Sequence, residues 1–141
     1  MGRIINPESA AKERNLFIRA ILVSLRELMN QTEINLKTRD LASFIALTLL
    51  EIGDTVEASV GAWEKRGYWV KADRFRMEWV WTGTIGNDLR MAIIEENWQE
   101  VGRLSAKIMG KLSHVKIPIR HGIQSPWSGS WARLKNNQSI T

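Results

Sequence analysis

The chain has 141 residues, of which 44% are hydrophobic and 25% charged, with a formal net charge of +5 at pH 7. This length allows one domain that buries about two-thirds of its surface. The chain has no cysteine, which excludes disulfides, thiolate catalysis and cysteine-ligated metals and fits a reducing compartment.

The excess of positive over negative charge lies entirely in the C-terminal part of the chain. Before residue 101 the sequence has 13 Lys and Arg against 15 Asp and Glu, a net charge of −2. The last 41 residues have no acid and these seven cations: Arg103, Lys107, Lys111, Lys116, Arg120, Arg133 and Lys135. This uncompensated charge of +7 favours an acidic partner for that part of the chain.

The sequence shows no targeting signal and no membrane span. No apolar run follows a basic start at the N-terminus, as it does in a secretory signal peptide. The longest apolar stretch, from Phe44 to Ile52, is interrupted by Thr48 and Glu51 and is too short to cross a bilayer. We therefore expect a cytoplasmic protein without a membrane partner.

Two amphipathic helices are predicted in the first half. The first runs from Pro7 to about Met29, with Asn6 as its cap and an apolar stripe along one side. The second opens at Thr38, its expected cap, and ends at Lys65 and Arg66 before Gly67. Its stripe contains apolar residues at helical spacing: Leu41, Ile45, Leu49, Ile52, Val56, Val60 and Trp63.

A third helix is predicted directly after Gly67. Its stripe has no charged residue: Tyr68, Ala72, Phe75, Trp79, Thr82, Gly86, Leu89 and Ile93. Thr82 and Gly86 lie mid-stripe, where a second backbone could come close. Because almost no linker separates this helix from the one before it, the two should form an antiparallel pair.

An alternative interpretation places a β-hairpin over residues 68–82. Phe75, Met77, Trp79 and Trp81 alternate with Arg74, Arg76, Glu78 and Val80, which is a strand pattern. With Leu41-Ala42, Thr55-Val56 and the segment 63–68, about 45 residues then resemble a winged-helix DNA-binding domain. The resemblance implies a DNA-binding regulator whose wing is this hairpin.

The fourth helix is predicted from an Asn97 cap with Glu100 to about Ser113. Arg103, Lys107 and Lys111 recur every four residues on its outer side. After His114, proline and glycine interrupt regular structure, but Trp127 and Trp131 indicate that the tail covers the bundle or a partner. We therefore predict an all-α, antiparallel four-helix bundle over residues 1–114, with an irregular C-terminal extension over residues 115–141.

One acidic pair suggests an enzymatic alternative. Glu51 and Asp54 lie three residues apart on one side of the second helix, and paired carboxylates can hold Mg²⁺ for phosphate chemistry. They resemble half of the signature of the all-α nucleotide pyrophosphohydrolases, the MazG-like family. The resemblance implies a second acidic group on the preceding helix, where Glu27 is the candidate.

Basic and aromatic residues carry the main functional prediction. Cations that neutralise phosphates and aromatic rings that stack on bases are typical of sequence-tolerant nucleic-acid binders. This combination is formed by Arg103, Lys107, Lys111, Lys116, Arg120, Trp127 and Trp131. We predict a non-catalytic subunit, without cofactor or metal, that binds nucleic acid or an acidic protein. A protein–protein scaffold or homo-oligomer is the alternative, because seven Trp can also form subunit interfaces.

Overall fold

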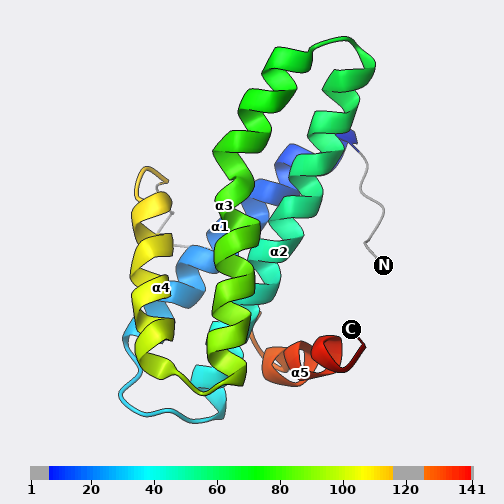
Figure 1. Ribbon diagram of the computed structural model, residues 1–141. Helices are drawn as coiled ribbons and strands as arrows, with labels where there is room; N and C mark the ends of the chain where they lie inside the picture. Colours follow the sequence, from blue (N-terminus) through cyan, green and yellow to red (C-terminus); the bar gives the residue numbers. More distant parts are fainter. Residues whose placement is uncertain (1–6, 116–125, 141) are drawn as a thin grey trace.

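The computed structural model describes residues 7–115 and 126–140. Within them the chain forms helices and no strand: α1 (Pro7–Met29), α2 (Leu36–Lys65), α3 (Trp69–Ile94), α4 (Trp98–Lys111) and α5 (Ser130–Ile140). The predicted all-α bundle is confirmed by the packing of α1 to α4 (Figure 1). The C-terminal extension adds α5, a helix that was not predicted.

The alternative prediction of a β-hairpin is wrong, because α3 is one continuous helix over these residues. A strand would place Phe75, Met77 and Trp79 on the same face. In the structure, Phe75 and Trp79 pack against the core, whereas Met77 between them is 72% exposed. The helical period thus decides the local structure, and the winged-helix resemblance lacks its wing.

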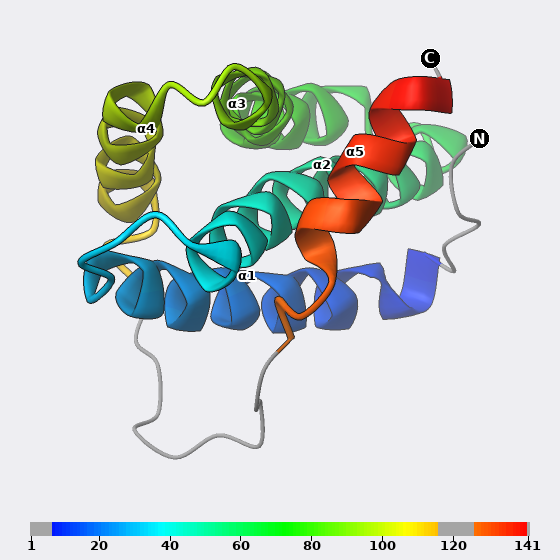
Figure 2. The ribbon, with the colours of Figure 1, turned by 90° about the horizontal axis from the view of Figure 1, so that it is seen from below.

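Helix α2 lies at the centre of the bundle. Of its 30 residues, 14 are buried, compared with 7 of the 26 residues of α3. It packs against α1, α3 and α5, while α4 packs mainly against α3 and more lightly against α1 (Figure 2). The core thus forms around the stripe of α2 rather than around that of α3.

The first turn of α2 is held by a capping box that begins before the predicted cap. Helix α2 starts at Leu36, and Asn35 is its cap. The Asn35 side chain accepts from the Thr38 N–H at 3.0 Å, and the Thr38 hydroxyl accepts from the Asn35 N–H at 3.3 Å. Thr38 is therefore the third helical residue, and its assignment as the cap is wrong. At α4 the predicted Asn97 cap is confirmed, with its side chain 3.2 Å from the Glu100 N–H.

A tight turn with fixed backbone geometry joins α2 to α3. Gly67 has a φ of +82°, in the left-handed region. Its N–H donates to the Glu64 carbonyl at 3.0 Å, and the Tyr68 N–H donates to the Trp63 carbonyl at 2.9 Å. These two bonds form a Schellman motif. Figure 1 shows that the turn lies at an extremity of the molecule, beyond α1, α4 and α5.

Helices α2 and α3 come very close at Gly86. A Cβ placed on Gly86 would lie 3.0 Å from Leu50 Cδ2 and 3.3 Å from Leu49 Cβ. Side-chain atoms of α2 therefore pack closely on α3 at this position, and the expected approach of a second backbone stays a prediction. A Cβ placed on Gly83, one turn earlier, would meet no neighbouring atom within 4 Å.

We predict opposite effects for two glycine substitutions in α3. Gly83→Ala should raise the free energy of unfolding by about 0.5–1 kcal/mol, because alanine favours the helix and open space receives its methyl group. Gly86→Ala should lower it, because overpacking costs about 1–3 kcal/mol and exceeds that gain. Urea denaturation of both variants measures the difference, and equal stabilisation would contradict the close approach.

Candidate basic and aromatic surfaces

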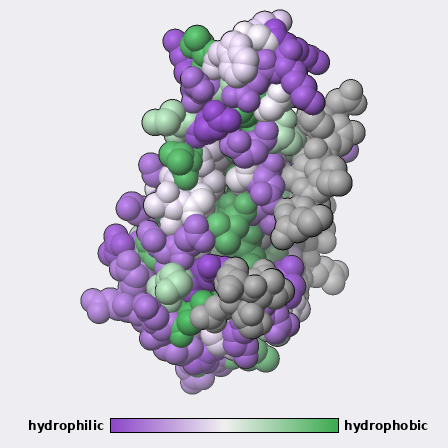
Figure 3. Space-filling view, turned by 45° about the vertical axis from the view of Figure 1, so that its right-hand side comes forward, coloured by the Kyte–Doolittle hydropathy of each residue, from purple (hydrophilic) through white to green (hydrophobic). Residues whose placement is uncertain are grey.

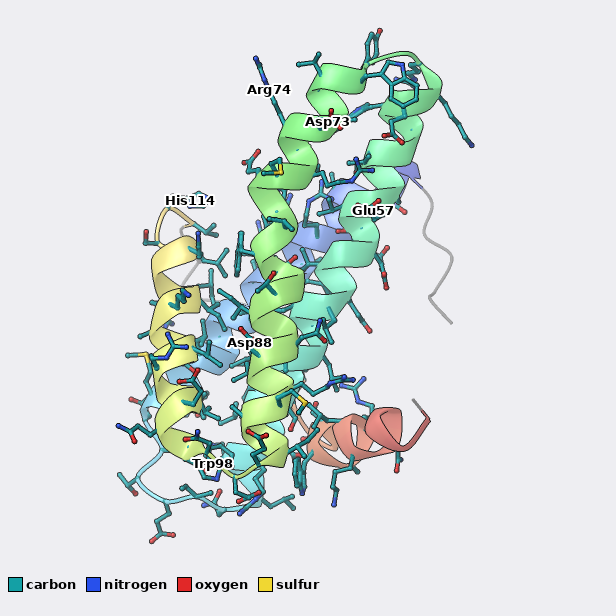
Figure 4. The ribbon with its side chains drawn as sticks, in the orientation of Figure 1. Glu57, Asp73, Arg74, Asp88, Trp98 and His114 are labelled. Atoms are coloured by element: carbon teal, nitrogen blue, oxygen red, sulfur yellow. The ribbon has the colours of Figure 1, made fainter. Side chains whose placement is uncertain are left out.

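The predicted basic ridge of α4 is exposed, but its first cation is paired. Arg103 Nε donates to Glu100 Oε1 at 2.7 Å, and this hydrogen bond raises the pKa of Arg103 and lowers that of Glu100. The negative charge of Asp88, which is labelled on α3 in Figure 4, also raises the pKa of Arg103. Lys107 and Lys111 are exposed and form no ion pair with any carboxylate among residues 7–115 and 126–140. They are therefore the available cations of the ridge.

Two of the predicted binding residues, Lys116 and Arg120, lie outside the described residues. His114 is exposed just after the end of α4 (Figure 4). The structure thus describes only the α4 residues of the predicted basic surface. The roles of Lys116 and Arg120 stay a prediction.

The C-terminal tryptophans pack against the bundle. Trp127 is 9% exposed and clusters with Val23 and Leu41. Trp131 is partly buried, and Leu134 of α5 is fully buried in the main core. The described part of the tail therefore covers the bundle, as one of the two expectations held. The Trp127 ring offers little surface for a base to stack on.

Asp40 of α2 caps α5 from 89 residues away. Its carboxylate, 7% exposed, accepts the Gly129 N–H at 3.3 Å and the Trp131 N–H at 2.9 Å. The first N–H groups of a helix have no partner inside the helix, and a negative charge is favourable at that end. This contact explains how an 11-residue helix can form after the prolines and glycines of the tail.

The cations and tryptophans that are neighbours in the sequence do not form one surface. Helix α4 packs against α3 and α1, whereas α5 packs against α2, and Figures 1 and 2 show the two helices on different sides of the α2–α3 pair. Lys135 covers the Trp131 ring at 4.9 Å, and Lys37 of α2 lies 5.9 Å from the Trp127 ring. These two rings therefore meet cations of their own chain.

Several other aromatic side chains surround a buried arginine. Arg14 is 7% exposed, donates to Thr55 Oγ1 at 3.2 Å and lies over the rings of Phe75 and Trp79 at 4.8 and 5.8 Å. Desolvation lowers the pKa of Arg14, and the negative charge of Glu78 raises it by a smaller amount. Trp63 packs edge-on against Phe75 at 4.9 Å. These rings therefore hold a charge inside the bundle.

A second basic and aromatic surface lies at the α2–α3 turn, where the prediction had placed none. We call residues 65–74 the hairpin end. Among the seven Trp of the chain, all within the described residues, Trp69 alone is largely exposed, at 59%. Tyr68 is 53% exposed, so its assignment to the buried stripe of α3 is wrong. Two adjacent aromatic residues beside the terminal Gly67 were the signal in the sequence.

The acidic side chains near the hairpin end gather on one arginine. Arg76 Nε lies 3.3 Å from Glu57 Oε2. Its two terminal nitrogens lie 3.6 Å from Glu64 Oε2 and 3.6 Å from Asp73 Oδ1. The hydrogen bond to Glu57 is the main cause of the raised pKa of Arg76. Figure 4 shows Arg74 pointing away from both helices. The exposed cations of the hairpin end, namely Lys65, Arg66, Lys71 and Arg74, form no ion pair within the described part of the chain.

The acidic pair Glu51 and Asp54 does not meet its expected partner. Glu27 instead forms an ion pair with Lys37 Nζ at 3.3 Å. Lys37 lies 14 residues before Glu51 in α2, which separates the two residues by roughly 21 Å along the helix axis at ~1.5 Å per residue. No group of three or more acidic or histidine side chains within residues 7–115 and 126–140 could hold a metal ion. The MazG-like resemblance therefore extends to half of the motif and not to a second acidic group in space.

No protein-family model, curated protein or solved structure matches this chain. Among the described residues, no helix combines the length and the apolar character that a membrane crossing requires.

We predict that Asp40→Ala detaches α5 from the bundle. Removing the carboxylate leaves the N–H groups of Gly129 and Trp131 without their acceptor, and losing a helix cap costs about 1–2 kcal/mol. Asp54→Ala, an exposed aspartate on the same helix, is the matched control. Urea denaturation should show the loss of stability, and hydrogen exchange should accelerate at the amides of residues 129–134. Unchanged exchange at these amides would contradict the capping role.

Proposed function

We propose that this protein is a non-catalytic interaction subunit that binds nucleic acid through exposed cations on α4. The observation that carries the proposal is that Lys107 and Lys111 are both exposed and unpaired within the described residues. They lie four residues apart on one side of the helix, roughly 6 Å along its axis. The proposal includes the cytoplasmic location expected from the cysteine-free composition.

The proposed mechanism is electrostatic. Lysine side chains neutralise backbone phosphates and release condensed counterions, which makes the affinity depend steeply on salt. Arg103 contributes less than the two lysines, because Glu100 already balances its charge. Lys116 and Arg120 extend the proposed surface along the sequence, whereas Trp127 and Trp131 serve in packing.

We predict that Lys107→Glu combined with Lys111→Glu strongly weakens binding of nucleic acid without unfolding the bundle. Both side chains are exposed, so the reversal of charge changes the surface and not the core. The matched control is Lys12→Glu with Arg19→Glu, which reverses two exposed cations of α1 and gives the same net charge. Titration of labelled single- and double-stranded DNA at two salt concentrations measures the affinity. Equal losses in both double variants would show that only net charge matters.

A homo-oligomer is the second candidate, favoured by an apolar surface on α3. Met77 and Val80 are 72% and 57% exposed, and the partly buried Trp81 beside them stacks on Trp79. Helix α4 covers the other half of α3 and leaves this half open (Figure 1). Apolar residues that are exposed together often mark subunit interfaces.

For this second candidate we predict that Met77→Glu with Val80→Glu converts an oligomer into a monomer. Charges in an apolar interface lose their hydration, which opposes association. Light scattering coupled to gel filtration measures the mass of the wild type and the variant. A monomeric wild type would remove this candidate and leave nucleic-acid binding unaffected.

A further inference from the structure

We infer that the hairpin end is a separate binding surface for unpaired nucleic-acid bases, with Tyr68 and Trp69 as the stacking groups. The inference rests on the proposed partner class and adds both a second surface and a preference for single strands. The aromatic rings of the C-terminal tail pack against the bundle, whereas the exposed rings that lie beside cations are at the α2–α3 turn.

The exposure of the rings is the first support. Tyr68, Trp69 and Val70 are consecutive, and each is more than half exposed. The other six Trp are buried or partly buried within the described residues. Figure 3 shows pale and green side chains together with purple ones at this extremity of the molecule. Fully solvated aromatic rings lose the free energy of burial, so their exposure at an extremity suits a partner that covers them.

The charge around the rings is the second support. Lys65 and Arg66 precede them, and Lys71 and Arg74 follow them. The three acids nearby, Glu57, Glu64 and Asp73, all lie against Arg76. With five cations against these three acids, residues 57–76 keep a net charge of +2. The surface around the rings therefore attracts an anionic partner, and phosphates on either side of a stacked base meet this charge pattern.

The rigidity of the turn is the third support. The Schellman bonds fix the backbone from Trp63 to Tyr68, and the Tyr68 carbonyl accepts the Ala72 N–H at 3.0 Å in the first turn of α3. Lys71 also lies 4.5 Å from the Trp63 ring, which ties the two helices together. The rings are thus presented without a flexible loop, which reduces the entropy lost on binding.

The chemistry of the surface favours bases over lipids. Two of the three apolar side chains are aromatic, and every base offers a π-face to such a ring. Val70 is the only aliphatic member, so little apolar area is available for insertion into acyl chains. Bases in a duplex are already stacked on each other, so the preferred ligand is single-stranded. Anionic membranes, which also attract cations and aromatic rings, form the competing arm of the test.

The test compares the full chain with Trp69→Ala, Trp69→Phe and Leu16→Ala. Leu16→Ala removes an exposed apolar side chain from α1 and is the matched control. The probes are a labelled 20-residue oligo-dT, a duplex of the same length, and vesicles of phosphatidylcholine with and without phosphatidylserine. We expect Trp69→Ala to weaken oligo-dT binding roughly tenfold or more, because base stacking on an aromatic ring is lost. Trp69→Phe and Leu16→Ala should stay within about threefold of the wild type.

The salt dependence distinguishes this inference from the proposed function. Trp69→Ala should leave the dependence of affinity on salt unchanged, whereas Lys107→Glu with Lys111→Glu should reduce it and weaken both DNA probes. If only the α4 variant loses affinity, the inference about the hairpin end fails and the proposed function stands. If only Trp69→Ala loses affinity for oligo-dT, the hairpin end stands and the α4 surface fails. Binding to phosphatidylserine vesicles that requires Trp69, without binding to oligo-dT, would overturn the inference.

Discussion

The burial of α2 on three sides is the constraint on which the rest of the molecule depends. Its stripe from Leu41 to Val60 is fully or almost fully buried, and α1, α3 and α5 each cover part of it. A helix buried on several sides must be apolar around most of its circumference, and the middle of α2 meets this requirement. Because α1, α4 and α5 leave the last turns of α2 uncovered (Figure 1), the α2–α3 pair extends beyond them and forms the exposed hairpin end.

The helices that follow local rules could be predicted from the sequence, and the one that depends on a distant contact could not. Helix α1 begins and ends at the predicted residues, and Gly67 and Asn97 end α2 and start α4 as their chemistry suggests. Helix α5 depends on a carboxylate 89 residues earlier in the chain, and no local pattern around Gly129 reveals Asp40. Local spacing therefore predicts the bundle, whereas the docking of the tail requires the tertiary structure.

The candidate surface was predicted only in part, because neighbours in a sequence need not share a surface. Lys107 and Lys111 are exposed as predicted, since the apolar residues of α4 fix which side faces water. Trp127 and Trp131 were predicted beside them, but Trp127 clusters with Val23 and Leu41, and α5, which contains Trp131, packs against α2. The buried Arg14 is another tertiary feature, because its contacts with Thr55, Phe75 and Trp79 join three helices.

Local pairing, more than the charge of a segment, decides where this chain can attract an anion. Residues 101–141 carry all of the positive excess, yet Arg103 is balanced by Glu100. Residues 1–100 carry a net charge of −2, yet the acids nearest the hairpin end lie against Arg76, and the four cations around Trp69 form no ion pair within the described residues. From Trp69 to Asp88, the residue of α3 that acts on Arg103, the distance is roughly 28 Å at ~1.5 Å per residue. This exceeds the Debye length of about 8–10 Å, so charges near Arg103 and at the hairpin end act on a partner independently.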